Sequence, residues 1–448
     1  MKKFNREKAL RKIEFQRKWR RCSRYVYITI PCILCGILGL YLAYSKFFIT
    51  QENDVVQTKV GDFVYGDVII NNYVNGQYTV EAPAKATGYK VDKIVCDNGA
   101  VGEWSGKDWG PIISNVTRRS KCNIYFADGD KINIGNVAVL LDAYNRCPTV
   151  NADGTVAVTE KEEYYGYLCK AKDTYGDSYY YRGNVTNNYV KFAGFYWRII
   201  RINGDGTVRV IYDGTSAHAN GERSTDRQIG TTAFNSNGND NAYVGYMYGK
   251  TGASTYAETH ANTNNSIIKT YLDTWYENNI KGTANEQYIA DNIFCNDRSF
   301  VSNNSGTGAG TSTTYYRWYN FADNANNNKM MLTCPQKNDA FTVSDTTNGN
   351  GALTYGVGLV TTDEVVLAGG WNSSNYNYYL YIGQGYWTIS PNYFNGSYAY
   401  ERNVHSSGYA SLYDGVGYTN GARPVFNLKS EVLSQGTGTA SDPYHLAS

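Results

Sequence analysis

Polar and apolar residues alternate in short stretches between residues 62 and 127. Gln77–Glu81, Lys90–Val95 and Cys122–Phe126 each alternate in this way, and Gly, Asn and Asp residues separate them. A repeat of two residues is typical of strands with one buried face. The pattern therefore predicts a small β-sandwich module over residues 62–127, preceded by a linker over residues 48–61.

A helical repeat of hydrophobic positions occurs in three later segments. Asn136–Asn145 carries apolar residues at steps of three and four, which predicts a short helix within a two-cysteine connector over residues 128–179. Ser266–Ile280 repeats the pattern over a longer stretch with one broad apolar face. Thr361 and Glu364 stand three residues apart before an apolar run that ends at two glycines, which predicts a helix that begins with a capping box.

Strands and tight turns are predicted for much of the remaining chain. Tyr189–Ile202 and Val208–Tyr212 predict paired strands around a turn at Asn203–Thr207. That turn and Asn151–Val156 share an Asp-Gly step, which supplies the positive φ angles that hairpins need. Neither has the ligand spacing or the terminal Glu of a calcium-binding loop, so we expect turns and no metal site. The predicted fold class is α+β, with a C-terminal domain over residues 180–448.

The N-terminal region places a basic cluster before a long apolar run. Residues 1–24 contain eleven Lys and Arg against two Glu, and the nineteen residues Tyr25–Ala43 carry no charge. Such a run nearly suffices to cross a bilayer as a helix, and the positive-inside rule assigns its basic flank to the cytoplasm. The sequence thus predicts a cytoplasmic segment over residues 1–24, a transmembrane helix over residues 25–47 and single-pass localisation in the cell membrane, with the C-terminal part extracellular. A cleaved signal peptide is the alternative, but the basic region is long and no clear small-residue cleavage site follows.

Six of the nine cysteines follow the apolar run, and an even number suits disulfides in an extracellular chain. Neighbouring cysteines are expected to pair, because each pair falls within one predicted structural unit. The predicted pairs are Cys96 with Cys122, Cys147 with Cys169, and Cys295 with Cys334.

Two parts of the chain resemble known families. Residues 76–126 are similar to small β-repeat modules that act as spacers in Gram-positive surface proteins. Gly358–Gly370 (GLVTTDEVVLAGG), Gly385–Pro391 (GYWTISP) and Gly421–Leu433 (GARPVFNLKSEVL) resemble an uncharacterised domain family of surface proteins from gut Firmicutes. Members of that family resemble the C-type-lectin-like fold in its formylglycine-generating-enzyme branch. The resemblance implies a bacterial surface protein with a C-terminal C-type-lectin-like domain.

The resemblance does not extend to catalytic or metal-binding residues. Formylglycine-generating enzymes bind copper through two cysteines close to the C-terminal core, whereas no cysteine follows Cys334 in this sequence. The Glu-Pro-Asn calcium motif of animal lectins is also missing. The four His residues stand far apart, without the motif of a zinc protease, a nucleophile elbow or a phosphate-binding loop. We expect no catalytic residue, no cofactor and no enzyme activity.

The charge balance bears on the choice of partner. The chain has 42 Lys and Arg against 40 Asp and Glu, so subtracting the N-terminal eleven and two leaves 31 basic and 38 acidic residues after residue 24. A weakly acidic chain lacks the basic surface that nucleic-acid binding needs. The expected partners are therefore an extracellular glycan or protein and no nucleic acid.

Tyrosine is concentrated near the C-terminus. Residues 371–420 contain 11 Tyr, 7 Asn, 7 Ser and 6 Gly. Antibody binding loops use the same residue types, and aromatic faces beside neutral amides suit sugar rings. This composition also resembles the variable positions of lectin-like proteins that diversity-generating retroelements mutate. The candidate ligand-binding residues are Tyr393, Tyr398, Tyr400, His405, Tyr409 and Tyr413, while Trp387 and Arg423 are assigned to the core.

The predicted function is that of a membrane-anchored extracellular binding protein, an adhesin or receptor, which recognises a glycan or protein through its Tyr- and Asn-rich domain. One alternative is a cell-envelope enzyme with a formylglycine-generating-enzyme-like domain, which a convergent pocket with perturbed acids or a thiolate would favour. The other is a structural surface protein, in which the tyrosines serve only the packing of a hydrated β-surface.

Overall fold

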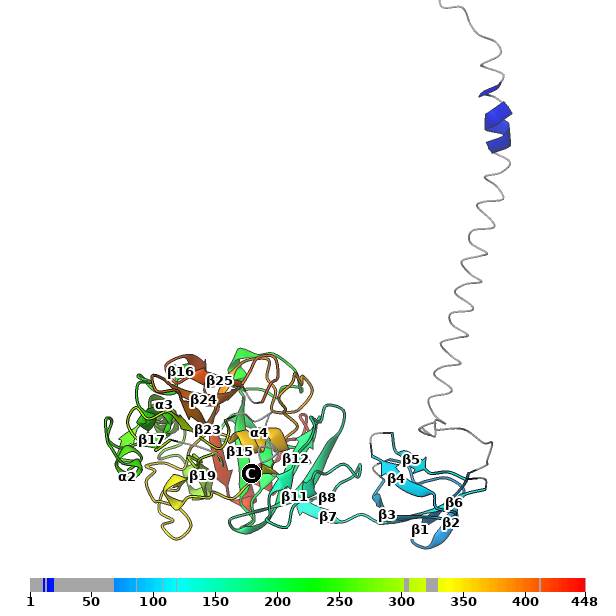
Figure 1. Ribbon diagram of the computed structural model, residues 1–448, viewed down its shortest axis with the longest axis horizontal. Helices are drawn as coiled ribbons and strands as arrows, with labels where there is room; N and C mark the ends of the chain where they lie inside the picture. The colour runs from blue at the N-terminus through cyan, green and yellow to red at the C-terminus, as the bar shows by residue number, and fades with distance from the viewer. Residues whose placement is uncertain are drawn as a thin grey trace, which may run out of the picture. The chain divides into compact units, whose positions relative to one another are not determined.

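The computed structural model describes residues 11–12, 14–19, 68–85, 87–106, 108–117, 119–301, 306–319, 329–410 and 412–447 (Figure 1). Among these residues 36% are in strands and 13% in helices, so the structure is mostly β-sheet. The predicted α+β class is wrong in this respect. The reason is that segments rich in Val, Ile, Tyr and Trp pair into strands, while the helices of the C-terminal region are few and short.

Residue contacts divide the described residues from 70 onward into two units, one containing residues 95–104 and 110–122, the other residues 70–94, 105–109 and those from 123 onward. In the first unit, β4 (Val101–Ser105) pairs with β5 (Gly110–Ser114), and a disulfide joins Cys96 to Cys122. The strands predicted around residues 77, 90 and 122 are confirmed. They belong to a four-stranded sheet in the order β2 (Gln77–Thr79), β1 (Ile69–Val74), β6 (Lys121–Asp128) and β3 (Tyr89–Cys96).

The helix predicted at Asn136–Asn145 is wrong, because the segment forms the second strand of a hairpin. β7 (Lys131–Ile134) pairs with β8 (Val137–Leu140) in antiparallel register. Gly135 turns the chain between them with a φ of 56°, and inside the predicted helix Asp142 and Asn145 have φ of 50° and 52°, which an α-helix does not allow. Two β-branched residues in β8 further favour a strand, so the spacing of apolar residues here comes from a strand followed by a turn.

Two six-stranded sheets form the body of the second unit (Figure 1). The first has the order β11 (Gly166–Asp173), β12 (Gly176–Gly183), β14 (Phe195–Ile202), β15 (Val208–Gly214) and β27 (Val425–Leu428), and β13 (Tyr189–Phe192) pairs with β14. The second has the order β16 (Thr231–Ala233), β26 (Thr419–Gly421), β23 (Tyr386–Phe394), β24 (Ala399–Val404) and β25 (Leu412–Gly415), and β20 (Thr314–Tyr315) pairs with β23.

Shorter pieces complete the unit. Small sheets are formed by β21 (Lys329–Met330) with β10 (Val156–Ala157) and β9 (Thr149–Val150), by β17 (Met247–Tyr248) with β18 (Asn264–Asn265), and by β19 (Phe294–Cys295) with β22 (Ala340–Phe341). The 3-10 turns are η1 (Thr225–Arg227), η2 (Asn241–Val244), η3 (Glu286–Tyr288), η4 (Lys337–Asp339) and η5 (Ser430–Leu433). The predicted strands around Asn203–Thr207 are confirmed, and the Asp-Gly turns place Gly154 and Gly206 at φ of 82° and 85°.

The two helices predicted in the C-terminal domain are confirmed. α3 (Ile267–Asn279) begins at Ser266, whose side chain accepts a hydrogen bond from the Lys269 amide. α4 (Thr362–Leu367) begins with the expected capping box between Thr361 and Glu364. A third helix, α2 (Tyr256–Thr259), spans a single turn, and residues 11–12 and 14–19 are also helical.

Trp387 and Arg423 both lie in the core, as the sequence predicts. Trp387 is fully buried, and its indole N–H donates to the carbonyl of Thr232 at 2.9 Å. Arg423 is fully buried as well and pairs with Asp213 at 3.0 Å, an acid that Arg227 contacts at 2.8 Å. Buried charges need such partners, so these two positions serve packing and charge neutralisation.

All three predicted disulfides are present, joining Cys96 to Cys122, Cys147 to Cys169, and Cys295 to Cys334. The sequence separations are 26, 22 and 39 residues. Three disulfides suit an oxidising compartment.

The prediction of a transmembrane helix and of single-pass localisation requires correction. Within the described ranges, no helix is long and apolar enough to cross a membrane. The run Tyr25–Ala43, on which the prediction rested, lies outside those ranges.

Candidate functional site

Two groups of side chains in the second unit could carry function, and the first is an ion network at the start of α4. Glu364 lies within 3.1 Å of the Arg201 guanidinium and 2.5 Å of that of Arg209, and Arg201 also contacts Asp173 at 2.6 Å. All four side chains are almost fully buried. Burial alone would raise the pKa of Glu364, but the two guanidinium groups outweigh it and lower that pKa.

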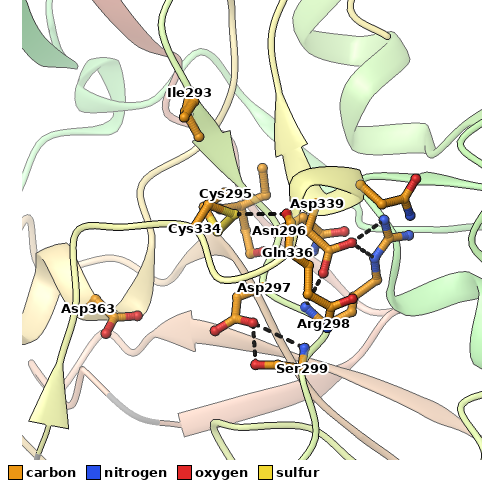
Figure 2. Close-up of a disulfide and its surroundings, with 12 residues drawn as sticks. Ile293, Cys295, Asn296, Asp297, Arg298, Ser299, Cys334, Gln336, Asp339 and Asp363 are labelled. Carbon is orange, nitrogen blue, oxygen red and sulfur yellow. Dashed lines mark hydrogen bonds and ion pairs between the residues drawn. A yellow bond between two sulfur atoms is a disulfide. The ribbon is translucent and has the colours of Figure 1, made fainter. Parts of the chain in front are cut away.

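The network continues past a disulfide that Figure 2 shows. Arg317 contacts Asp297 and Asp363 at 2.5 Å each, and Asp363 also accepts from the Trp318 indole. The Cys295–Cys334 disulfide lies beside Asp297, whose other oxygen accepts from the hydroxyl and amide of Ser299 (Figure 2). Burial raises the pKa of Asp363 although Arg317 opposes this shift.

The ion network leaves little space for a ligand. It lines a cleft of about 20 Å³, together with Thr174, Asn292 and Ser390. A cavity of that size holds about one water molecule. The acids of the cleft are paired with arginines, and the sulfur of Cys295 is in a disulfide and is no thiolate. The arrangement therefore fits a structural role, in which buried charges fix α4 against the first sheet.

The second group is a set of tyrosines on the exposed face of the second sheet. Tyr393 on β23 lies opposite Tyr315 on β20 and opposite Tyr400 on β24. Tyr413 on β25 lies opposite Arg402, one diagonal step from Tyr400. We call Tyr315, Tyr393, Tyr400 and Tyr413 the tyrosine row.

The strand alternation explains why these rings share one face. Phe394 and Ala399, next to Tyr393 and Tyr400 in the sequence, are fully buried on the inner face. The four tyrosines of the row are instead half-buried or exposed, and Tyr413 is 45% exposed. The row therefore presents aromatic surface to the outside.

The rings pack against one another in a defined geometry. Tyr393 and Tyr400 stack with centroids 4.4 Å apart and an angle of 5° between their planes. Tyr413 stands almost perpendicular to both, with centroids at 5.4 Å and 5.7 Å. Tyr315 lies 6.3 Å from Tyr393, and Tyr319 packs against Tyr315 at 4.1 Å. Stacked and edge-to-face pairs are the favoured arrangements of aromatic rings, so the row is held in place before any ligand arrives.

A buried cation lies beneath the row. Arg402 is 3% exposed, and its guanidinium carbon lies 5.6 Å from the centre of the Tyr413 ring. The same guanidinium donates to the carbonyl of Trp318. Burial lowers the pKa of Arg402 to about 9, partly offset by Tyr413 and Tyr393. Arg402 thus supports the rings from within the sheet face and is not offered to solvent.

Tyr398 borders the row but is packed in a slot made by glycines. A Cβ atom at Gly238, Gly415 or Gly417 would lie within 2.3–2.7 Å of the Tyr398 ring or hydroxyl. The Gly417 amide donates to that hydroxyl at 3.2 Å. The ring lies 5.7 Å from that of Tyr400. Tyr398 therefore supports the edge of the row, a structural use that the sequence did not separate from ligand contact.

The structure brings together four of the six candidate residues, Tyr393, Tyr398, Tyr400 and Tyr413. His405 and Tyr409 form a separate turn after β24, in which the His405 amide donates to the Tyr409 carbonyl at 2.9 Å and Tyr409 bridges to Trp371. Tyr315 and Tyr319 also belong to this face but lie outside residues 371–420, whose composition alone indicated a binding surface. The alternation in Thr313–Tyr319 (TTYYRWY) was the available signal.

Comparisons with known proteins add no family or activity. No family model, no curated protein and no solved structure matches the chain. The resemblances to β-repeat modules and to the lectin-like family thus stay predictions. Among the described residues, no cluster of three or more His, Cys, Asp and Glu could hold a metal ion.

Proposed function

We propose that this protein is an extracellular binding protein that recognises its ligand through the tyrosine row. The observation that carries the proposal is the cross-strand placement of Tyr315, Tyr393 and Tyr400, with Tyr413 diagonal to them, on an exposed sheet face. Tyrosine offers a large rigid surface at a low cost in side-chain entropy, and it combines an apolar ring with a hydroxyl. The disulfides support an oxidising, extracellular setting.

The geometry favours binding over the two alternatives. An enzyme of the predicted kind needs a pocket with an unpaired acid, base or thiolate, whereas the acids around α4 are neutralised by Arg201, Arg209 and Arg317. A structural protein needs no half-exposed aromatic row on one sheet face, since an exposed apolar patch invites association with other molecules.

The proposal can be tested by screening the full chain against an array of glycans and a panel of extracellular proteins. The screen is repeated with the Tyr400→Ala/Tyr413→Ala double variant. Tyr376→Ala is the matched control, because Tyr376 is 51% exposed and lies outside the row. Binding that the double variant loses and the control keeps supports the proposal. If no probe binds, or if both variants bind like the wild-type protein, the proposal fails.

A further inference from the structure

One pair of rings in the tyrosine row is in contact and close to parallel. Tyr393 and Tyr400 have centroids 4.4 Å apart and planes that differ by 5°. Their strands pair at these two residues, so the sheet register holds the rings face to face. Two rings that stack in this way direct their π orbitals toward each other. The pair is therefore arranged for a reaction between the two rings.

Phenols undergo such a reaction when they are oxidised. Removal of one electron and one proton from tyrosine leaves a neutral radical. Its unpaired electron occupies the π orbitals of the oxygen and of the ring carbons beside the hydroxyl-bearing carbon. Because the lobes of these orbitals point out of the ring plane, two such radicals form a carbon–carbon bond most readily when their rings face each other. Close centroids and parallel planes are thus the criteria for coupling.

Other tyrosine pairs meet these criteria less well. Tyr413 stands almost perpendicular to Tyr393 and Tyr400, at 84° and 89°. Tyr315 and Tyr319 are in contact, but their planes differ by 36°. Three stacked pairs elsewhere among the described residues have angles of 14–23° and centroid distances of 4.6–5.0 Å, namely Tyr144 with Tyr165, Tyr276 with Tyr355, and Tyr73 with Tyr125. Tyr393 and Tyr400 are therefore the best aligned of these pairs.

The hydroxyl ends of the rings lie together as well. Burial raises the pKa of Tyr393, and the neighbouring hydroxyl groups of Tyr413 and Tyr400 add to the rise. The ring carbons beside these hydroxyl groups, which carry the unpaired electron after oxidation, therefore also lie near one another. Tyr393 and Tyr400 are half-buried and not sealed in the core, so a small oxidant in solution reaches them.

No described thiol competes with this pair for oxidation. Free thiols reduce tyrosine radicals by giving up a hydrogen atom. All six described cysteines are joined in disulfides, which also suit an oxidising compartment. A radical on Tyr393 therefore meets the ring of Tyr400 and no thiol of the described part of the chain.

From this arrangement we infer that Tyr393 and Tyr400 form an oxidative cross-linking site, at which a peroxidase that uses hydrogen peroxide joins the two rings as dityrosine. Each ring gives up one electron and one proton, and a carbon–carbon bond forms between the ring carbons beside the two hydroxyl-bearing carbons. The hydrogen on each of these carbons then moves to the oxygen and restores the phenol. One hydrogen peroxide takes up both electrons and both protons and is reduced to two water molecules.

The product joins β23 to β24 covalently at the centre of the second sheet. This inference goes beyond the proposed function, because it concerns a covalent change within the row itself and requires no ligand.

The experiment treats the full chain at low concentration with a haem peroxidase and hydrogen peroxide, and then separates monomers from linked oligomers under denaturing conditions. The monomers should show the fluorescence of dityrosine. Chymotrypsin cleaves after Phe394 and Tyr398, which lie between the two residues. Mass spectrometry should then find a peptide with Tyr393 joined to a peptide with Tyr400, lighter than their sum by two hydrogen atoms.

Three variants locate the cross-link. Tyr393→Phe and Tyr400→Phe keep the rings but lack the hydroxyl group that oxidation to a tyrosine radical requires. Each should lose the cross-link and still unfold in denaturant like the wild-type protein, which separates lost chemistry from misfolding. Tyr376→Phe is the matched control and should retain the cross-link, because Tyr376 is 51% exposed and lies outside the row.

Several outcomes overturn the inference. Monomers without dityrosine, or dityrosine in the monomer that maps to another pair such as Tyr144 with Tyr165, show that the alignment of Tyr393 and Tyr400 does not direct coupling. Monomer dityrosine that persists at the same level in Tyr400→Phe shows the same. None of these results bears on ligand binding, which the screen of glycans and proteins tests separately.

Discussion

The ring of Tyr393 stacks on the ring of Tyr400 at a centroid distance of 4.4 Å, with the planes 5° from parallel. The two residues are cross-strand partners on β23 and β24, so the sheet register itself sets their separation. Such a pair contributes about 0.5–1.5 kcal/mol beyond the burial of its area. The stack orders the centre of the row without a ligand, which lowers the entropy that binding would otherwise cost.

The ion network around α4 should be essential for stability. Glu364→Gln removes the negative charge that neutralises Arg201 and Arg209, and we expect a loss of about 3–5 kcal/mol in the free energy of unfolding. The control is Lys170→Ala, which breaks a pair with Asp177 whose side chains are 46% and 45% exposed and should cost less than about 1 kcal/mol. Chemical denaturation of both variants checks the contrast, and equal losses would contradict it.

Glu401 should make the fold less stable as the pH rises. It is fully buried, and neither carboxyl oxygen has a hydrogen-bond partner among the described residues. Desolvation raises its pKa well above 4.5, although Arg298 opposes the shift. The folded state therefore keeps a proton that the unfolded state loses above pH 4.5, and stability falls with pH from there toward the folded pKa, by up to about 1.4 kcal/mol per pH unit.

Glu401→Gln removes this titration. The difference in the free energy of unfolding between Glu401→Gln and the wild-type protein should therefore increase, in favour of the variant, as the pH rises above 4.5. Denaturation curves at several pH values measure it. Parallel pH profiles for the two proteins would show that Glu401 is not the group responsible.

His218 should contribute stability in the opposite pH range. Its ring nitrogens lie 2.8 Å from Glu222 and 2.9 Å from Asp226. Burial by itself would lower the pKa of His218, but hydrogen bonds to Asp226 and Glu222 outweigh burial and raise it. A base with a raised folded pKa stabilises the fold fully below its unfolded pKa of about 6.5, and the contribution is lost as the pH rises through the folded pKa.

His218→Gln should accordingly destabilise the protein more at pH 5.5 than at pH 8.5. The expected loss at the lower pH is about 1–2 kcal/mol, typical of hydrogen bonds to charged groups. His405→Gln, at an exposed turn, is the control and should change stability little at either pH. If His218→Gln lowers the free energy of unfolding equally at both pH values, the contacts of protonated His218 with Glu222 and Asp226 do not stabilise the fold.

The disulfides should contribute different amounts to the free energy of unfolding, because they close loops of different length. Cys295 and Cys334 are 39 residues apart and Cys147 and Cys169 are 22 apart. Chain entropy predicts losses of about 3.9 and about 3.4 kcal/mol for the corresponding double Cys→Ser variants. Denaturation without reductant measures both, and a larger loss for the shorter loop would show that native packing, not loop closure, dominates.

Local signals made several parts of the structure predictable from the sequence. The capping box of α4 and the apolar face of α3 are determined within a few residues, and both helices form where expected. The Asp-Gly turns and the neighbouring cysteine pairs are equally local. The β7–β8 hairpin was misread, because Val137–Leu140 also satisfies a helical spacing and only pairing with Lys131–Ile134 decides between the two.

The candidate site was predictable only in part. Tyr393, Tyr400 and Tyr413 lie close in sequence and could be grouped from composition. Tyr315 joins them through pairing of β20 with β23, a contact across 78 residues that no local pattern reveals. The charge partners of Glu364 are still more distant along the chain, since Arg201 and Arg209 lie on β14 and β15. Long-range register therefore decides both the tyrosine row and the buried ion network.

The most direct measurement compares Tyr400→Ala with Tyr400→Phe in calorimetric titrations of the full chain with the tightest-binding probe from the screen. Because Tyr400 stands at the centre of the row, loss of its ring should weaken binding at least tenfold, or about 1.4 kcal/mol. The phenylalanine variant keeps the ring and should stay within about threefold of the wild-type affinity, a difference of roughly 0.6 kcal/mol. If Tyr400→Ala binds as tightly as the wild-type protein, the tyrosine row is not the binding surface.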